Sequence, residues 1–206
     1  MNRRDAISRV ALIMGGAVIG ADFFISGCKS TPKQVNALFT EDHVAFLNEV
    51  ADTILPTTSS PGAKAADVGH FMAVMVQDCY EPKDQKVFIA GIGKLNDAST
   101  KKYNAKFIDL NTQQRNDLLV ALDKEQKAYT DNRNKQIEGD RMKHIDDPKH
   151  KGPEIPNHYF RMMKELTLLG YFTSEIGATK ALRYIAIPGR YDGCVPYKKG
   201  DKAWAT

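Results

Sequence analysis

Cysteine is scarce in this chain, and so are the motifs in which cysteine holds a cofactor. The 206 residues include three cysteines and contain no C-x-x-C or C-x-x-C-H stretch. Structural zinc, iron–sulfur clusters and covalently attached haem rely on such closely spaced ligands. The sequence therefore gives no sign of these groups, and so few thiols do not build a disulfide scaffold.

The usual signatures of a catalytic centre are also missing. There is no G-x-S-x-G elbow of a serine hydrolase. The nearest match to a dinucleotide-binding loop, residues 91–96, lacks the third glycine and lies within a helical pattern. Glu49 and Asp52 stand three residues apart and could act as an acid–base pair, although a polar helix face explains them as well. We expect no catalytic or cofactor-binding residue in this chain.

A metal site is not expected either. The chain has five histidines, and no two of them are three or four residues apart: His43, His70, His144, His150 and His158. Histidines at the protein surface or at helix caps account for this pattern. The charge is nearly balanced, with 29 Lys+Arg against 25 Asp+Glu, and the basic residues are not gathered in one stripe. We therefore expect no nucleic-acid partner.

The first 27 residues read as an export signal. Arg3 and Arg4 precede an apolar stretch over 10–25, which is short for a membrane span. Paired arginines in this position are the address of the twin-arginine pathway, which exports folded proteins. Residues 25–28 resemble a lipobox, whose cysteine, Cys28, would be lipidated. A plain N-terminal anchor with an incidental cysteine and an ordinary secretion signal are the alternatives.

After the signal, the sequence predicts a tether and one helical domain. Residues 28–38 form the tether, and 39–206 form a domain long enough to bury a core. Five helices are expected. The first extends from Thr40 to Pro56, the second from Asp67 to Glu81, and the third over about 83–104. The fourth begins at Asn111 within the segment 107–129, and the fifth lies within 156–172, with Gly170 as its stop. Asn111 and Gln114 have the spacing of a capping box. The fold class is all-α, a bundle of four to five helices with a long irregular C-terminal tail.

Helical spacing of apolar residues predicts which side of each helix faces the core. The expected core residues are Val44, Leu47, Ala51 and Ile54; Val68, Phe71, Met72, Met75, Val76 and Cys79; Phe88, Gly91, Ile92 and Leu95; Leu118, Leu119 and Leu122; and Phe160, Met163, Leu166 and Leu169. The mixed-charge stretch 131–153 has few large apolar residues, so it is either a long solvated loop or a frayed helix extension.

Aromatic residues gather at the C-terminal end. Eight of the 18 aromatics lie within 158–206, and the tail after the last predicted helix has little regular structure to bury them. Some could fold back on the bundle. The others favour a partner interface, because tyrosine, tryptophan and arginine are enriched there. The predicted interface residues are Tyr184, Arg190, Tyr191, Cys194, Tyr197 and Trp204.

Three segments resemble the gluconate 2-dehydrogenase subunit 3 family. They are VADTILPTTSSPGAKAADVGHFM (50–72), HYFRMMKELTLLGYFTSEIGATKALRYIAIPGRYDGCVPY (158–197) and KAW (202–204). The resemblance implies a non-catalytic small subunit of an FAD-dependent sugar or sugar-acid dehydrogenase. The FAD would lie in a large subunit of the glucose–methanol–choline type, and a multihaem cytochrome c would be a further partner. This chain departs from the simplest family pattern in its lipobox and in the charged stretch 131–153.

The resemblance also implies a reason for the paired arginines. The small subunit would carry the folded flavoprotein through the twin-arginine pathway, and Cys28 would anchor the complex to the periplasmic face of a bacterial membrane. The alternative is a free-standing lipoprotein that binds sugars through its C-terminal aromatics. Cys79 and Cys194 allow three states: a bridge between them, an inter-subunit bridge from Cys194, which the resemblance favours, or two thiols.

Overall fold

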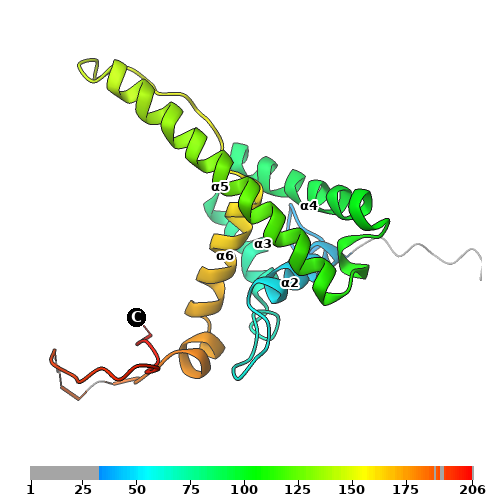
Figure 1. Cartoon of the computed structure of the whole chain (residues 1–206), viewed down its shortest axis with the longest axis vertical. Helices are drawn as coiled ribbons and strands as arrows, with labels where there is room; N and C mark the ends of the chain where they lie inside the picture. The colour runs from blue at the N-terminus through cyan, green and yellow to red at the C-terminus, as the bar shows by residue number, and fades with distance from the viewer. Residues whose placement is uncertain (1–32, 188, 191–192, 206) are drawn as a thin grey trace, which may run out of the picture. The chain divides into compact units, whose positions relative to one another are not determined.

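A computed structural model describes residues 33–187, 189–190 and 193–205 (Figure 1). The predicted export and lipidation residues Arg3, Arg4 and Cys28, and the predicted interface residue Tyr191, lie outside the described residues. The chain divides into two units, Met1–Lys33 and Gln34–Thr206, and the helices belong to the second.

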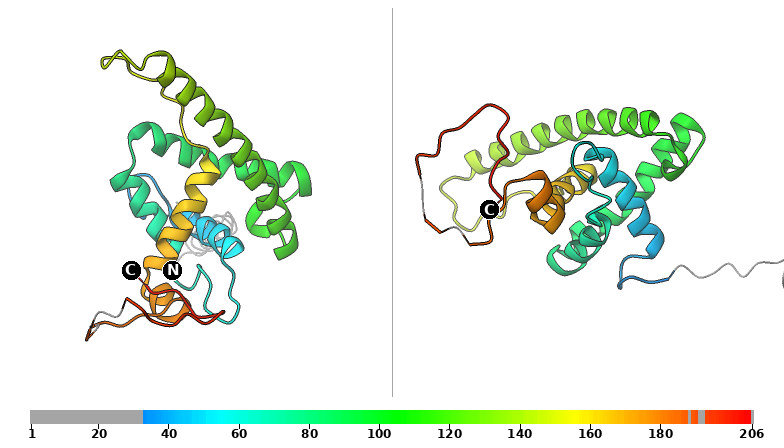
Figure 2. Two further views of the ribbon diagram at one scale, coloured as in Figure 1. Left: turned by 60° about the vertical axis from the view of Figure 1, so that its left-hand side comes forward. Right: turned by 90° about the horizontal axis from the view of Figure 1, so that it is seen from below.

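The second unit is an all-α bundle, as the sequence predicts, and its described residues contain no β-strand (Figures 1 and 2). Its elements are α2 (Glu41–Ile54), α3 (Val68–Cys79), α4 (Pro82–Tyr103), the 3₁₀ turn η1 (Phe107–Asp109), α5 (Thr112–Lys143), α6 (Tyr159–Thr173) and the π-helical turn η2 (Gly177–Ala181). None of the helices in the described part of the chain has the length and apolarity that crossing a membrane requires.

The helix starts follow local capping chemistry. The Thr40 hydroxyl accepts from the backbone N–H of His43 at 3.3 Å, and His43 Nδ1 accepts from the backbone N–H of Thr40. Asn111 and Gln114 form the predicted reciprocal box, with bonds of 2.9 and 3.2 Å. These caps satisfy backbone donors that the first turn of a helix leaves without partners.

The start of α3 differs from the prediction. Asp67 precedes the helix, but it has a left-handed backbone (φ 49°) and its side chain makes no cap hydrogen bond. Asn48 of α2 takes over this role, because its Oδ1 accepts from the Gly69 N–H at 2.7 Å while its Nδ2 donates to Asp67 at 2.9 Å. A tertiary contact between α2 and α3 thus replaces the local cap.

The core forms around α6, which packs against α2, α3, α4 and α5. Most of the predicted core positions on the five helices are buried or half-buried. Leu169 and Cys79 are the exceptions, since both are exposed. The prediction that Gly170 stops the helix is also wrong, because α6 continues to Thr173.

Gly170 is needed for close packing and not for termination. It is buried, and a Cβ at this position would lie 2.5 Å from Cδ1 of Phe71 on α3. Carbon atoms in contact normally lie about 3.5–4.0 Å apart. The glycine therefore lets the Phe71 ring reach the backbone of α6.

The charged stretch 131–153 begins as regular helix. α5 continues to Lys143, although none of its residues after Gln126 is buried. The chain then returns along the helix: Ile155 accepts from Arg133 Nε at 2.8 Å, and Pro156 accepts from the Tyr129 hydroxyl at 3.0 Å. Figure 1 shows this extension of α5 running beyond the other helices, with the return segment beside it. The helix-extension alternative is the one observed.

Candidate docking surface at the C-terminus

The C-terminal tail forms a loop whose two ends are joined. Arg183 and Trp204 make an isolated parallel β-bridge, in which Arg183 N–H donates to Ala203 at 2.8 Å and Ala205 N–H donates to Arg183 at 2.9 Å. We call residues 183–204 the C-terminal loop. The hydrogen bonds of the bridge hold the two ends of this loop together, and its described residues are drawn orange to red in Figure 2.

Side chains strengthen the base of the loop. The guanidinium of Arg183 lies over the Trp204 ring, 4.2 Å from its centroid. An arginine above an indole face is attracted by the ring electrons. Arg183 Nε is buried there and makes no hydrogen bond with any described residue, so the stacked geometry carries a desolvation cost. Lys202 adds a bond from its ammonium to the Lys180 carbonyl of η2.

The loop exposes several large apolar side chains. They are Tyr184, Ile185, Ile187, Val195, Tyr197 and Trp204, with exposed fractions from 46% for Trp204 to 84% for Ile187. Large apolar side chains exposed together in one segment are typical of interaction sites. The sequence analysis did not identify the aliphatic residues Ile185, Ile187 and Val195, because it searched this segment for aromatic residues and not for aliphatic ones. A count of all large apolar residues in this irregular segment would have found them.

The predicted interface residues that the structure describes are all at the surface. Tyr184, Tyr197 and Trp204 are exposed, as are Arg190 and Cys194. None of the three aromatics folds back into the core of the bundle. Arg183 is not among the predicted interface residues. Its guanidinium instead stacks on the Trp204 ring and holds it in place.

The segment between α6 and the loop is held tightly. Ser174 ends α6; its hydroxyl donates to the Tyr171 carbonyl at 2.6 Å and accepts from Gly177 N–H at 3.0 Å. A Cβ on Gly177 would overlap the Tyr171 carbonyl at 1.8 Å, so only glycine fits. Ser174 thus caps the end of α6, and it sets the direction in which the chain leaves the bundle.

The loop 57–67 reaches the same end of the bundle (Figures 1 and 2). The Tyr171 hydroxyl donates to the Pro61 carbonyl at 2.5 Å, and Gly62 packs so closely that a Cβ would lie 2.6 Å from the Thr57 nitrogen. The two longest segments that carry the resemblance, 50–72 and 158–197, are therefore packed against each other.

Glu49 does not form an acid–base pair with Asp52. Its carboxylate binds Arg115 of α5 and Lys64 of the 57–67 loop. Burial raises the pKa of Glu49, but the hydrogen bonds from Lys64 and Arg115 outweigh burial, and the net effect is a lowered pKa. Arg115 also donates to the carbonyls of Phe107 and Ile108. Glu49 is thus a structural anion that joins α2, α5 and the loop.

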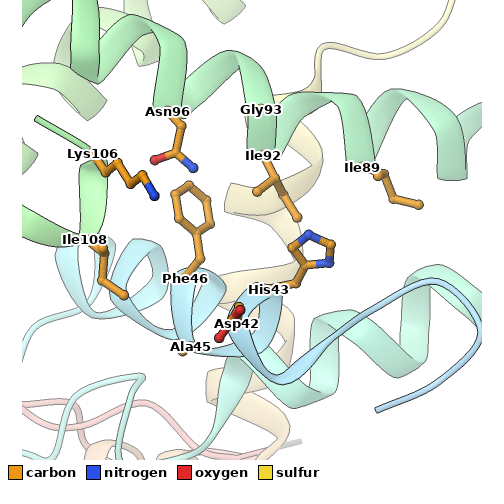
Figure 3. A pocket seen from close by; sticks show the side chains of 10 residues that line it. All are labelled: Asp42, His43, Ala45, Phe46, Ile89, Ile92, Gly93, Asn96, Lys106 and Ile108. Carbon is orange, nitrogen blue, oxygen red and sulfur yellow. The ribbon is translucent and has the colours of Figure 1, made fainter. Parts of the chain in front are cut away.

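A cleft in the described residues combines apolar side chains with a few polar ones. It measures about 570 Å³ and lies between α2, α4 and the segment around η1 (Figure 3). Two of its polar side chains already serve the fold: His43 belongs to the Thr40 cap, and Asn96 Oδ1 accepts from Phe107 N–H at 3.1 Å. Figure 3 shows Phe46 between Asn96 and Ile92, so the floor is apolar.

His158, another of the five histidines, caps α6 and stacks on Tyr159. Burial lowers the pKa of His158, and Glu125 opposes this effect. Burial also raises the pKa of Tyr159 to about 12. Both side chains support the N-terminal end of α6. His144 and His150, however, were expected at separate surface positions, and the structure brings them together.

The structure forms no disulfide between Cys79 and Cys194, and both are exposed. The expectation that Cys79 is buried in the stripe of α3 is wrong. α3 and α6 run antiparallel, with Phe71 against Gly170 and Tyr80 near Glu165. Cys79 therefore lies about 12 Å further along α3 than Phe71, away from the end where the tail begins.

The sequence matches a family model for a dehydrogenase subunit. The family model for gluconate 2-dehydrogenase subunit 3 matches residues 41–189, more than half of the chain. The chain belongs to the gluconate 2-dehydrogenase subunit 3 family, and it is a small subunit of that type. The match covers all five helices and the first part of the C-terminal loop. No curated protein and no solved structure matches the chain.

Proposed function

We propose that this chain is the non-catalytic small subunit of an FAD-dependent sugar or sugar-acid dehydrogenase, and that it escorts the flavoprotein through twin-arginine export. The family supplies the class of complex. The observation that carries the docking role is the C-terminal loop, which is fixed at its base and displays six large apolar side chains. A preorganised loop loses little conformational entropy when it binds.

The partner in this proposal is a large subunit of the glucose–methanol–choline type that holds the FAD, with a cytochrome c as a further electron acceptor. Arg3 and Arg4 would direct export, and Cys28 would attach the complex by lipid to the periplasmic face of the membrane. The small subunit contributes no catalytic group. His43 and His158 serve as helix caps, and Glu49 forms ion pairs with Arg115 and Lys64. These structural roles agree with a subunit that contributes no catalytic group.

Serine variants of the loop test the proposal. Ile187→Ser and Tyr197→Ser remove exposed apolar surface without touching the bridge between Arg183 and Trp204. Co-expression with the proposed flavoprotein subunit should give weakened co-purification for both variants, by roughly tenfold in affinity for each apolar anchor. Val120→Ser is the matched control, because Val120 is equally apolar and 49% exposed, but lies on α5.

Unchanged co-purification of the two loop variants would disprove docking through the loop. Trp204 is the only tryptophan of the chain, so its fluorescence reports on the loop directly. The alternative of a free-standing sugar-binding lipoprotein predicts a fluorescence change with sugar alone. One face of the Trp204 ring is already covered by Arg183, which leaves less surface for stacking on a sugar. We expect a response to the flavoprotein and none to sugars.

A further inference from the structure

We infer that Asp140, His144 and His150 form a binding site for a divalent transition-metal ion at the end of the α5 extension. One possible ligand atom from each side chain lies within 4.8 Å of the other two. Two imidazoles and one carboxylate are a set that zinc, copper, nickel and iron accept.

The backbone explains how residues without metal-ligand spacing come together. Asp140 lies on the last turn of α5, and His144 is the residue that caps the helix, with its backbone N–H donating to the carbonyls of Asp140 and Arg141. Two successive turns follow: Asp147 N–H donates to the His144 carbonyl at 3.0 Å, and His150 N–H donates to the Asp147 carbonyl at 3.1 Å. These turns reverse the chain and return His150 to the helix.

The side chains already face one another. His150 Nε2 lies 2.6 Å from Asp140 Oδ2, and His144 Nδ1 lies 3.5 Å from Asp140 Oδ1. The two imidazole rings stack at 3.6 Å between centroids and 15° between planes. His144 Nδ1 also lies 2.9 Å from the backbone carbonyl of Asp140, so this ring has to turn, or bind through Nε2, to ligate an ion. Ligand atoms in a tetrahedral zinc site lie about 3.3 Å apart, given Zn–N and Zn–O bonds near 2.0 Å. Small side-chain shifts would accommodate the ion.

The chemistry balances without any further reactant. In the hydrogen bond between His150 and Asp140, the proton sits on His150 Nε2, because an ionised carboxylate only accepts. When a metal ion binds Nε2, that proton passes to solvent and Nδ1 takes one up from water, so the imidazole stays neutral with its single proton on Nδ1. The ion is then bound by three side chains and completes its coordination with water. His144, whose side chain is 40% exposed, gives it a path from solvent.

The cavity around the three side chains has room for a metal ion. The three residues line a cavity of about 440 Å³, together with Ile137, Asp147 and Arg141. Arg141 pairs with Glu138 at 3.5 Å, and the Asp147 carboxylate accepts from Lys149 N–H at 3.0 Å, so both charges already have partners. A bound ion would join the return segment to α5 at its far end, where the bonds of Arg133 and Tyr129 do not reach.

Calorimetric titration with Zn²⁺ tests the site, using the full chain without a histidine tag and after chelator treatment. We expect one ion per chain. Loss of an outer-shell partner alone costs 10–100-fold in metal affinity, so His144→Gln and His150→Gln should each weaken binding by at least about 100-fold. His70→Gln is the matched control, since His70 is also exposed but lies on α3.

Two readouts separate a metal site from a simple hydrogen-bonded cluster. Co²⁺ should give visible absorption bands typical of low coordination number in the native chain and in His70→Gln, and not in the other two variants. Hydrogen exchange in residues 144–152 should slow when Zn²⁺ is added. Zinc binding that is absent, or equal in all variants, would overturn the inference. Neither readout requires a dehydrogenase partner, so the outcome is independent of the proposed function.

Discussion

The Tyr171 hydroxyl donates a hydrogen bond of 2.5 Å to the carbonyl of Pro61, joining residues 110 positions apart in the chain. Tyr171 is at the end of α6, from which the C-terminal loop departs, and Pro61 is in the loop that follows α2. Only 4% of Tyr171 is exposed. This one bond therefore connects the 57–67 loop to the end of the bundle from which the candidate docking surface extends.

Tyr171→Phe removes the hydroxyl and leaves the Pro61 carbonyl without this donor. We expect the free energy of unfolding to fall by about 1–2 kcal/mol, since a half-buried acceptor loses its partner. Tyr129→Phe is the matched control, because it removes an exposed bond to the Pro156 carbonyl and should cost less than about 1 kcal/mol. Chemical denaturation of both variants checks the difference, and equal losses would contradict it.

Gly170→Ala should also destabilise the bundle. Its Cβ would meet the Phe71 ring, and overpacking of a close contact costs about 1–3 kcal/mol. Gly139→Ala on the exposed part of α5 meets nothing within 4 Å and should stabilise the chain by about 0.4–1 kcal/mol. Thermal melts check both signs. Phe71→Leu in the Gly170→Ala background should recover part of the loss, and no recovery would show that the clash lies elsewhere.

Acid should weaken the contact between α5 and α6. The hydrogen bond from Lys164, at 2.6 Å, is the main cause that lowers the pKa of Asp123 from its usual 3.8 to about 2, with burial opposing and Lys127 assisting. The folded state thus holds its proton less tightly than the unfolded state. Asp123 stabilises the fold above about pH 4, and this contribution is lost between pH 4 and 2.

Asp123→Asn should lower stability by about 1 kcal/mol at neutral pH, because Asp123 is partly exposed and screened by water. The curves of the native chain and the variant should converge near pH 2. Asp117→Asn is the control, since Asp117 is exposed and accepts only from Gln113. Denaturation at several pH values checks the prediction, and a constant difference down to pH 2 would refute it.

Cys28→Ser should release the exported chain from membranes when it is expressed without its partner. A serine cannot carry the thioether-linked lipid, and stable attachment needs more than one acyl chain. Sedimentation of membranes after a high-salt wash measures the effect. Cys79→Ser is the control, because Cys79 is an exposed thiol that plays no part in anchoring. Attachment of Cys28→Ser would exclude lipidation at this position.

Replacement of both Arg3 and Arg4 by lysine should block export of this chain and of the flavoprotein with it. The charge is unchanged, so an ordinary secretion signal would tolerate the double substitution, whereas the twin-arginine pathway reads the arginines themselves. Arg9→Lys is the control within the same segment. Cell fractionation checks the location of both subunits, and normal export of the double variant would point to the general pathway.

Local chemistry settled much of the fold. The spacing of Leu118, Leu119 and Leu122 identified a buried face, and Asn111 with Gln114 identified a helix start, because both depend on neighbours within one or two turns. The family was also recognisable from the sequence, since its segments are long and distinctive. The sequence also indicated an interaction surface in the irregular tail, because this segment has more aromatic residues than it can bury.

Tertiary structure alone decided the rest. Gly170 has the sequence signature of a helix stop, but it is a packing position because Phe71 of another helix approaches it. Asp67 lost its cap role to Asn48, which α2 brings alongside. His144 and His150 lack any ligand spacing, and two turns after α5 bring them to Asp140. Each of these depends on where distant segments meet, which local periodicity does not encode.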